Sequence, residues 1–320
     1  MTEPLPRRRL GRTGLEVTEL CFGTSPLANI PGLYGYDVTE ERAVATVLEA
    51  FESPVRFLDT SNGYGPDGES ERRIGEAIRR RGGLPDDLLL ATKVDPDPAT
   101  GDFSGARVRA SFAESLDRLG VDRIALLHFH DPERIDFDDA MAPGGAVEAL
   151  LELQAEGAVD HLGVAGGPIE LLRRYVATGH FDVALTHNRF TLLDRSAEPL
   201  IADAVALDVA VLNAAPYGGG MLAKGPSTTA RYAYGERESV RRAALEMEAA
   251  CDRYGVPLRA AALQFSLREP RIASTVVGVS APERIRQTLE LAAFGIPDPL
   301  WDELEALVPP RDTWLDAPEG

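Results

Sequence analysis

The chain has 320 residues, of which 44% are hydrophobic and 26% charged, a composition typical of a soluble globular protein whose core needs no disulfide or structural metal. Its formal net charge of -18 argues against nucleic acid or an anionic membrane as a partner, because both require a basic surface. Two widely separated cysteines, no apolar stretch long enough for a bilayer and no apolar run behind the first basic residues predict a cytoplasmic protein.

Eight short apolar segments, rich in Val, Ile, Leu and Ala, are typical of parallel strands that are buried on both faces. The expected strands cover residues 20–23, 55–61, 88–94, 124–130, 161–166, 183–190, 209–215 and 274–279. Ahead of the first strand, residues 9–17 predict a β-hairpin that places its turn at Gly11 and Gly14.

Amphipathic segments that predict helices alternate with these strands. Thr39 followed by Glu40 and Glu41 forms a helix cap, and Gly120 ends another helix. The expected helices cover residues 39–51, 70–81, 104–119, 146–156, 169–177, 196–206, 239–254 and 282–293.

This alternation predicts the α/β class and, within it, a (β/α)₈ TIM barrel formed by one domain over residues 1–320, with the hairpin closing its bottom. A doubly wound open sheet is the alternative. It would normally carry a GxGxxG turn after the first strand, where this chain has Gly23-Thr24-Ser25-Pro26. Long segments at 95–105 and 217–238 are expected to be loops at the catalytic end, and 308–320 to form a tail.

Three polar residues end predicted strands: Asp59, Lys93 and His130, with Tyr64 five residues beyond Asp59. In a barrel these ends meet at the face where active sites lie. A buried lysine beside a tyrosine is expected to lower the phenol pKa from its usual value of about 10, while the aspartate orients the lysine. The set predicts proton exchange at a carbonyl or hydroxyl oxygen while a hydride moves elsewhere.

Each of these residues also has a structural explanation when it is taken alone. Asp59 could cap a turn and Lys93 could lie at the surface, so only the joint pattern favours catalysis. His161, His180 and His187 lack metal-ligand spacing and are interpreted as structural or surface residues. The acidic residues from 131 to 139 lack an EF-hand pattern, so we predict no metal site there.

The chain resembles the aldo-keto reductase superfamily over residues 9 to about 301. Leu10-Gly11-Arg12-Thr13-Gly14, Phe57-Leu58-Asp59-Thr60-Ser61, Thr92-Lys93-Val94 and His130-Asp131-Pro132 carry the resemblance. It implies a barrel that uses NAD or NADP, with Asp59, Tyr64, Lys93 and His130 as the catalytic tetrad and the tyrosine as acid in reduction or base in oxidation. Counting from Leu119-Gly120-Val121-Asp122 places the family histidine on His130 rather than on the deeper His128.

A narrower resemblance is to L-fucose and D-threo-aldose 1-dehydrogenases, with pyridoxal 4-dehydrogenases close by. Segments 187–194, 214–222 and 260–265 carry it. It implies oxidation of an aldose at C1 to a lactone. Alternatives are an aldehyde or ketone reductase, a pyridoxal 4-dehydrogenase and, from another class, a nicotinamide-binding regulatory subunit. The sugar, the direction and the oligomeric state stay open.

The resemblance also implies a set of cofactor contacts. These are Gly23, Thr24, Asp59, Asn188, Pro216, Gly218, Leu222, Gly278, Val279, Arg284, Gln287 and Thr288. Gly278-Val279 replace a Lys-Ser pair that holds phosphate in the family, while the following arginine is kept as Arg284. This departure favours NAD, with NADP tolerated. Ala165-Gly166 and Ala214 replace further family contacts to the nicotinamide.

Overall fold

The computed structural model describes residues 5–317, so the last three residues of the expected tail lie outside it. Eight parallel strands form a closed barrel in the order β12-β3-β4-β5-β6-β7-β8-β9. The expected (β/α)₈ barrel is therefore confirmed. The barrel strands are β3 (Leu20–Gly23), β4 (Phe57–Asp59), β5 (Leu89–Val94), β6 (Ile124–His130), β7 (Val159–Gly166), β8 (Val183–His187), β9 (Ala210–Ala214) and β12 (Ile272–Gly278).

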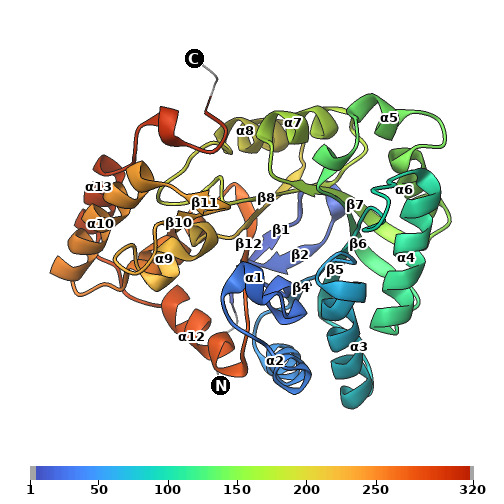
Figure 1. Cartoon of the computed structure of the whole chain (residues 1–320), viewed down its shortest axis with the longest axis horizontal. Coiled ribbons are helices and arrows are strands. Elements are labelled where there is room, and N and C mark those ends of the chain that lie inside the picture. The colour runs from blue at the N-terminus through green and yellow to red at the C-terminus, as the bar shows by residue number, and fades with distance from the viewer. Residues whose placement is uncertain (1–4, 318–320) are drawn as a thin grey trace.

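Helices surround the strands as an outer layer (Figure 1). The ring comprises α2 (Glu40–Glu52), α3 (Glu69–Arg81), α4 (Gly105–Leu119), α6 (Ala146–Ala155), α7 (Ile169–Ala177), α8 (Glu198–Ala206), α11 (Leu258–Leu267) and α12 (Pro282–Ala292). Each buries an apolar stripe against the strands and its neighbours. The ends follow local chemistry: the Thr39 hydroxyl caps α2, and Gly120 ends α4 in the left-handed conformation.

The segment between β9 and β12 differs from the expectation. Residues 239–254 do form a helix, α10 (Glu238–Arg253), but α11 is the helix that packs on β12. The alanine-rich sequence of α11 lacks a polar face because the helix is almost wholly buried, so periodicity did not reveal it. Helix α10 packs against α11 and α13 (Asp298–Ala306), at the outer edge of the molecule in Figure 1.

Three short helices lie in the loops that follow β3, β6 and β9. They are α1 (Pro31–Tyr34), α5 (Phe137–Met141) and α9 (Met221–Lys224). A small ribbon, β10 (Arg231–Tyr232) with β11 (Gly235–Glu236), lies in the long loop after β9. In residues 5–317 no helix has both the length and the apolarity needed to cross a membrane.

The expected N-terminal hairpin is present as β1 (Arg7–Arg9) paired with β2 (Glu16–Thr18). Leu10 and Val17 are almost fully buried and pack with side chains of the barrel interior such as Phe57 and Leu126. Gly11 has φ +55°, and a Cβ there would stand 2.6 Å from the backbone nitrogen of Ala210, so only glycine fits this approach. The hairpin therefore seals the end of the barrel where the strands begin.

Candidate active site

The mouth of the barrel, meaning the end where its strands finish, contains a buried ion pair between adjacent strands. Asp59 is the last residue of β4, and Lys93 lies near the end of β5. The Lys93 Nζ donates to both carboxylate oxygens of Asp59 at 2.7 and 2.8 Å and to the carbonyl oxygen of Thr60 at 2.5 Å. These bonds use all three ammonium donors and hold the lysine, which is only 1% exposed, in one orientation.

Tyr64 lies over this pair, in the loop between β4 and α3. The Lys93 Nζ stands 4.8 Å from the centre of the half-buried phenol ring. Burial, followed by the charge of Asp59, raises the pKa of Tyr64 well above its ordinary value of 10. The expectation that Lys93 lowers the pKa of Tyr64 is therefore wrong. The physical reason is first that burial disfavours the charged phenolate, and second that Asp59 neutralises the lysine, so the phenol meets a buried ion pair rather than a free cation.

His130, the last residue of β6, meets Tyr64 edge to face with ring centres 5.7 Å apart. Its Nδ1 lies 2.7 Å from the Oδ1 of Asp95 and 3.1 Å from the Ser61 hydroxyl. Burial by itself lowers the pKa of His130, but Asp95 and Asp131 outweigh it and raise that pKa above 6.5. Asp95 belongs to the site, although the sequence indicated it only as the start of a loop.

His128, the alternative histidine, lies one layer deeper and opposite Lys93 in the register of β5 and β6. Neither of its ring nitrogens has a hydrogen-bond partner among the described residues. A Cβ at Gly163 would stand 2.2 Å from the Nδ1 of His128, so this glycine makes room for the ring. Burial, and to a smaller extent Lys93, lowers the pKa of His128 well below 6.5. His128 is therefore a neutral residue of the barrel core.

His187 also faces the mouth, contrary to its interpretation as a structural or surface residue. It ends β8, and its Nδ1 lies 2.7 Å from the Tyr234 hydroxyl, with the rings edge to face. Burial lowers the pKa of His187 to about 4, so it is neutral at physiological pH. The sequence position at a strand end could have indicated it.

The long loop after β9 crosses the mouth and is fixed by Tyr232. This side chain is 1% exposed, and its hydroxyl lies 2.8 Å from both the Thr191 hydroxyl and the carbonyl oxygen of Asn188. Tyr232 therefore anchors the loop, whereas Tyr234 is 65% exposed and reaches His187.

The tail closes the same face beside β7 and β8. Asp316 accepts hydrogen bonds from the Arg189 Nε at 2.8 Å and from the backbone nitrogen of Ile169 at 2.9 Å. The Asp194 carboxylate accepts one from the backbone nitrogen of Leu315 at 2.7 Å. These contacts make residues 315–316 part of the rim.

Eight of the twelve residues expected to hold a cofactor fall into two groups. Gly278 is exposed at the end of β12, and Arg284 and Gln287 share a side of α12, joined by a 2.8 Å hydrogen bond. By contrast, five of the side chains are buried: Thr24, Pro216, Leu222, Val279 and Thr288. Thr24 bonds the carbonyl oxygen of Asp59 at 3.0 Å, so its hydroxyl supports the end of β4.

Three further positions expected to contact the cofactor are Gly218, Gly23 and Asn188. Gly218 has φ +56°, and a Cβ there would stand 2.2 Å from the Tyr232 ring, so this glycine leaves room for the side chain that anchors the loop. Gly23 lies at the end of β3, where a Cβ would stand 3.0 Å from a Val276 methyl group. Asn188 is 5% exposed, and its side-chain oxygen is buried without a hydrogen-bond partner among the described residues.

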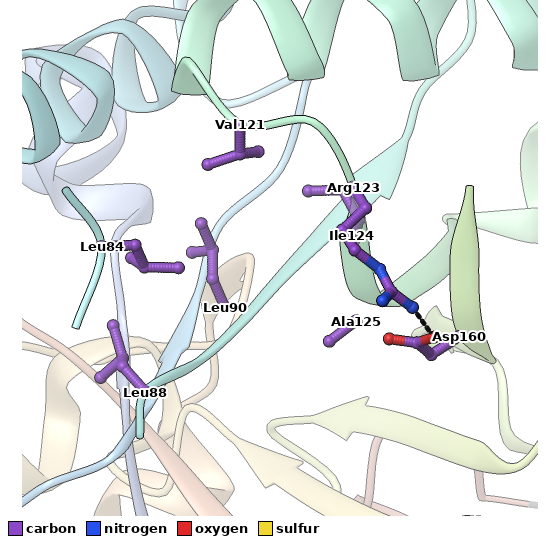
Figure 2. A pocket seen from close by; sticks show the side chains of 8 residues that line it. All are labelled: Leu84, Leu88, Leu90, Val121, Arg123, Ile124, Ala125 and Asp160. Atoms are coloured by element: carbon purple, nitrogen blue, oxygen red, sulfur yellow. Dashed lines mark hydrogen bonds and ion pairs between the residues drawn. The ribbon is translucent and has the colours of Figure 1, made fainter. Parts of the chain in front are cut away.

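A small apolar pocket of about 210 Å³ lies away from the mouth, at the starts of β5 and β6 (Figure 2). Aliphatic side chains such as Leu88 and Val121 line it, and Arg123 pairs with Asp160 at its edge. It contains none of the expected site residues. Within residues 5–317, no group of three or more His, Cys, Asp or Glu side chains could hold a metal ion.

Comparison with known proteins agrees with this geometry. A D-threo-aldose 1-dehydrogenase from Pseudomonas sp is 33% identical over 318 residues, covering 91% of this chain and 94% of the relative. An L-galactose dehydrogenase from Arabidopsis thaliana is 33% identical, covering 95% and 94% of the two chains. A pyridoxal 4-dehydrogenase from Microbacterium luteolum is 31% identical, covering 94% and 96%.

Among solved structures, an aldo-keto reductase from Bacillus halodurans superposes with a TM-score of 0.78 at 23% identity, covering 95% of this chain and 96% of that one. This likeness supports the fold. The model of the Aldo/keto reductase family matches residues 19–309, which is most of the chain. The protein therefore belongs to the aldo/keto reductase family of oxidoreductases.

Proposed function

We propose that the protein is an NAD(P)-dependent dehydrogenase that oxidises an aldose, such as L-fucose or a D-threo-aldose, at C1 to the lactone. The observation that carries this proposal is the meeting of the Asp59–Lys93 pair, Tyr64 and His130 in one half-buried mouth. The similarity to a D-threo-aldose 1-dehydrogenase and an L-galactose dehydrogenase supports the choice of a sugar.

In this proposal Tyr64 and His130 hold the oxygen on C1 of the sugar. The phenol oxygen of Tyr64 takes the proton of the C1 hydroxyl during oxidation and returns it to the carbonyl oxygen during reduction. The charge of Lys93, which Asp59 holds below the ring, offsets part of the negative charge of the phenolate that forms. The bound nicotinamide supplies the acceptor or donor of the hydride that leaves or reaches C1.

The residues of the mouth fit a nicotinamide cofactor. The buried side-chain oxygen of Asn188 lacks a partner and could accept from the amide group of a nicotinamide. The exposed Gly278 and Arg284 and the half-buried Gln287, on β12 and α12, would hold the far end of the cofactor. Val279, Leu222 and Thr288 could contribute only through their backbones, because their side chains are buried. With Arg284 and no lysine at position 278, we propose NAD as the preferred cofactor, with NADP tolerated.

The raised pKa of Tyr64 gives the proposal a pH signature. A phenol that keeps its proton at neutral pH is ready to donate in reduction but must first lose the proton before it can accept one. We therefore expect the rate of oxidation to increase as the pH rises into the alkaline range, and the rate of reduction to fall over the same range.

The test is reduction of NAD and NADP by purified protein with L-fucose, D-arabinose, L-galactose, L-xylose and pyridoxal, followed by nicotinamide absorbance. Rapid turnover with one sugar supports the proposal and ranks the two cofactors. No turnover with any of the sugars, together with oxidation of reduced cofactor by simple aldehydes, would contradict the proposal and indicate a reductase instead.

Two alternatives have distinct outcomes in the same assay. Turnover with pyridoxal alone would favour a pyridoxal 4-dehydrogenase, an activity carried by a relative with 31% identity. Cofactor binding without turnover in either direction would favour a nicotinamide-binding regulatory subunit.

A further inference from the structure

We propose that Asp95 is a positioning residue for His130: it holds the proton on Nδ1 and leaves Nε2 to face the reacting oxygen, to which it donates a hydrogen bond when the ring is charged. The inference rests on the proposed function, in which His130 contacts the reacting oxygen. It adds the group that decides what the histidine can offer to that oxygen.

The Asp95 carboxylate is built into the protein through separate bonds to each oxygen. Its Oδ2 accepts from the Ser61 hydroxyl at 2.5 Å and from the backbone nitrogen of Gly63 at 2.7 Å. Its Oδ1 lies 2.7 Å from the Nδ1 of His130. With Oδ2 occupied, Oδ1 is left for the histidine.

The backbone of Asp95 is held as firmly as its side chain. Its nitrogen donates to the Ser111 hydroxyl at 3.0 Å, and its carbonyl oxygen accepts from the Arg107 Nε at 3.2 Å, both on α4. A Cβ at Gly63 would stand 2.6 Å from the carboxyl carbon of Asp95, so position 63 must be glycine for the carboxylate to sit there. Asp95 is 7% exposed, which protects the bond to His130 from water.

The ionisation of Asp95 determines the tautomer of His130. Burial raises the pKa of Asp95, but His130, Ser61 and Gly63 outweigh it and lower that pKa to about 2. A carboxylate can only accept a hydrogen bond, so the Nδ1 of His130 carries a proton whether the ring is neutral or charged. The Oδ1 of Asp131 stands 3.6 Å from Nε2, too far for a hydrogen bond, so Nε2 is free for a substrate.

The two charge states of His130 then differ in what Nε2 can offer to the reacting oxygen. In the charged ring Nε2 carries a proton that can donate to the oxygen of a carbonyl or a hydroxyl group, and this leaves the proton of the C1 hydroxyl to Tyr64. In the neutral ring Nε2 has only a lone pair, which would compete with Tyr64 for that proton. Other titratable or charged groups also face the ring and contribute to its titration: Asp131, Glu133, Lys93, Tyr64, His128 and His187.

Nitrogen NMR of the histidine rings tests the proposal directly, because the chain has only five histidines. The His130→Gln variant assigns the signal. In the wild type we expect the proton of the neutral ring on Nδ1 and a titration midpoint above 6.5. In Asp95→Asn we expect the midpoint to move to lower pH. Ser61→Ala is the control: it removes a neutral neighbour of Nδ1 and one donor to Asp95 but keeps the charge of the carboxylate, so we expect the midpoint to stay above 6.5.

Kinetics supply a second readout. In Asp95→Asn we expect kcat/KM for carbonyl reduction to fall about 10- to 100-fold near neutral pH and its pH profile to shift in the same direction as the His130 midpoint. A neutral wild-type ring with its proton on Nε2, or an unchanged midpoint in Asp95→Asn, would overturn the proposal. The wild-type spectrum decides the matter even where the variant does not fold.

The NMR measurement needs no substrate, so the two proposals fail separately. A wild-type protein without turnover but with the expected His130 spectrum would contradict the proposed function alone. Normal sugar oxidation with an unchanged His130 midpoint in Asp95→Asn would contradict only the role of Asp95.

Discussion

Where the barrel strands begin, its interior contains Leu10 and Val17 of the hairpin, packed on apolar strand residues. Where they finish, it contains Asp59, Lys93 and Asp95, which are buried, and His130, which is partly buried. Burying apolar area stabilises the fold directly, whereas burying charges is tolerated only when each charge has its partner. The comparison teaches that mutations at the two ends should have different effects: those in the hairpin end should change stability alone, whereas those in the mouth should change activity as well as stability.

The largest expected effect on stability comes from breaking the charge pair in the mouth. Asp59→Asn leaves the Lys93 ammonium buried without its carboxylate, and we expect a loss of roughly 3–5 kcal/mol in the free energy of unfolding. Denaturant titration measures it. The double variant Asp59→Asn/Lys93→Met should recover most of that stability while remaining inactive. A double variant as unstable as the single one would contradict the view that the unpaired charge is the cause.

At the opposite end, Leu10→Ala should lower the free energy of unfolding by about 2–5 kcal/mol, because Leu10 is fully buried in the hairpin plug. We expect kcat/KM of the folded enzyme to stay at the wild-type value. Leu207→Ala is the matched control: this leucine is 47% exposed, and its loss should change stability by less than about 0.5 kcal/mol. A loss of activity in folded Leu10→Ala would show that the ends are coupled.

The smallest expected effect depends on pH. Asp95, whose pKa is lowered, stabilises the folded state above pH 3.8, and this contribution is lost as the pH falls toward about 2. His130, whose pKa is raised, stabilises the folded state below pH 6.5, and this contribution is lost as the pH rises through the pKa of His130 in the folded protein. The wild type should therefore exceed Asp95→Asn by on the order of 2 kcal/mol between about pH 4 and 6.5, and by less at alkaline pH. A difference that grows with alkaline pH would contradict the pairing.

The sequence predicted the barrel and the tetrad because both depend on local pattern. Apolar runs identify buried strands, and Asp59, Lys93 and His130 end such runs. Barrel closure then brings the strand ends together whatever the loops do. The buried helix α11 was missed because an alanine-rich helix without a polar face has no amphipathic period.

The remaining parts of the site depend on contacts between distant segments. Asp95 meets His130 across 35 residues, and Tyr234 reaches His187 across 47. Nothing in the local sequence of a loop indicates which strand end it will face. The pKa of Tyr64 was misjudged for the same reason, since its direction depends on burial and on how fully Asp59 neutralises Lys93.

The central claim is that Tyr64 moves the proton in the mouth of the barrel, and its most direct test is the rate of hydride transfer in Tyr64→Phe. We expect kcat to fall by about 10²- to 10⁴-fold, with unfolding and cofactor binding unchanged, because the ring stays and only the hydroxyl is lost. A folded Tyr64→Phe protein that turns over at the wild-type rate with the best substrate would contradict the account.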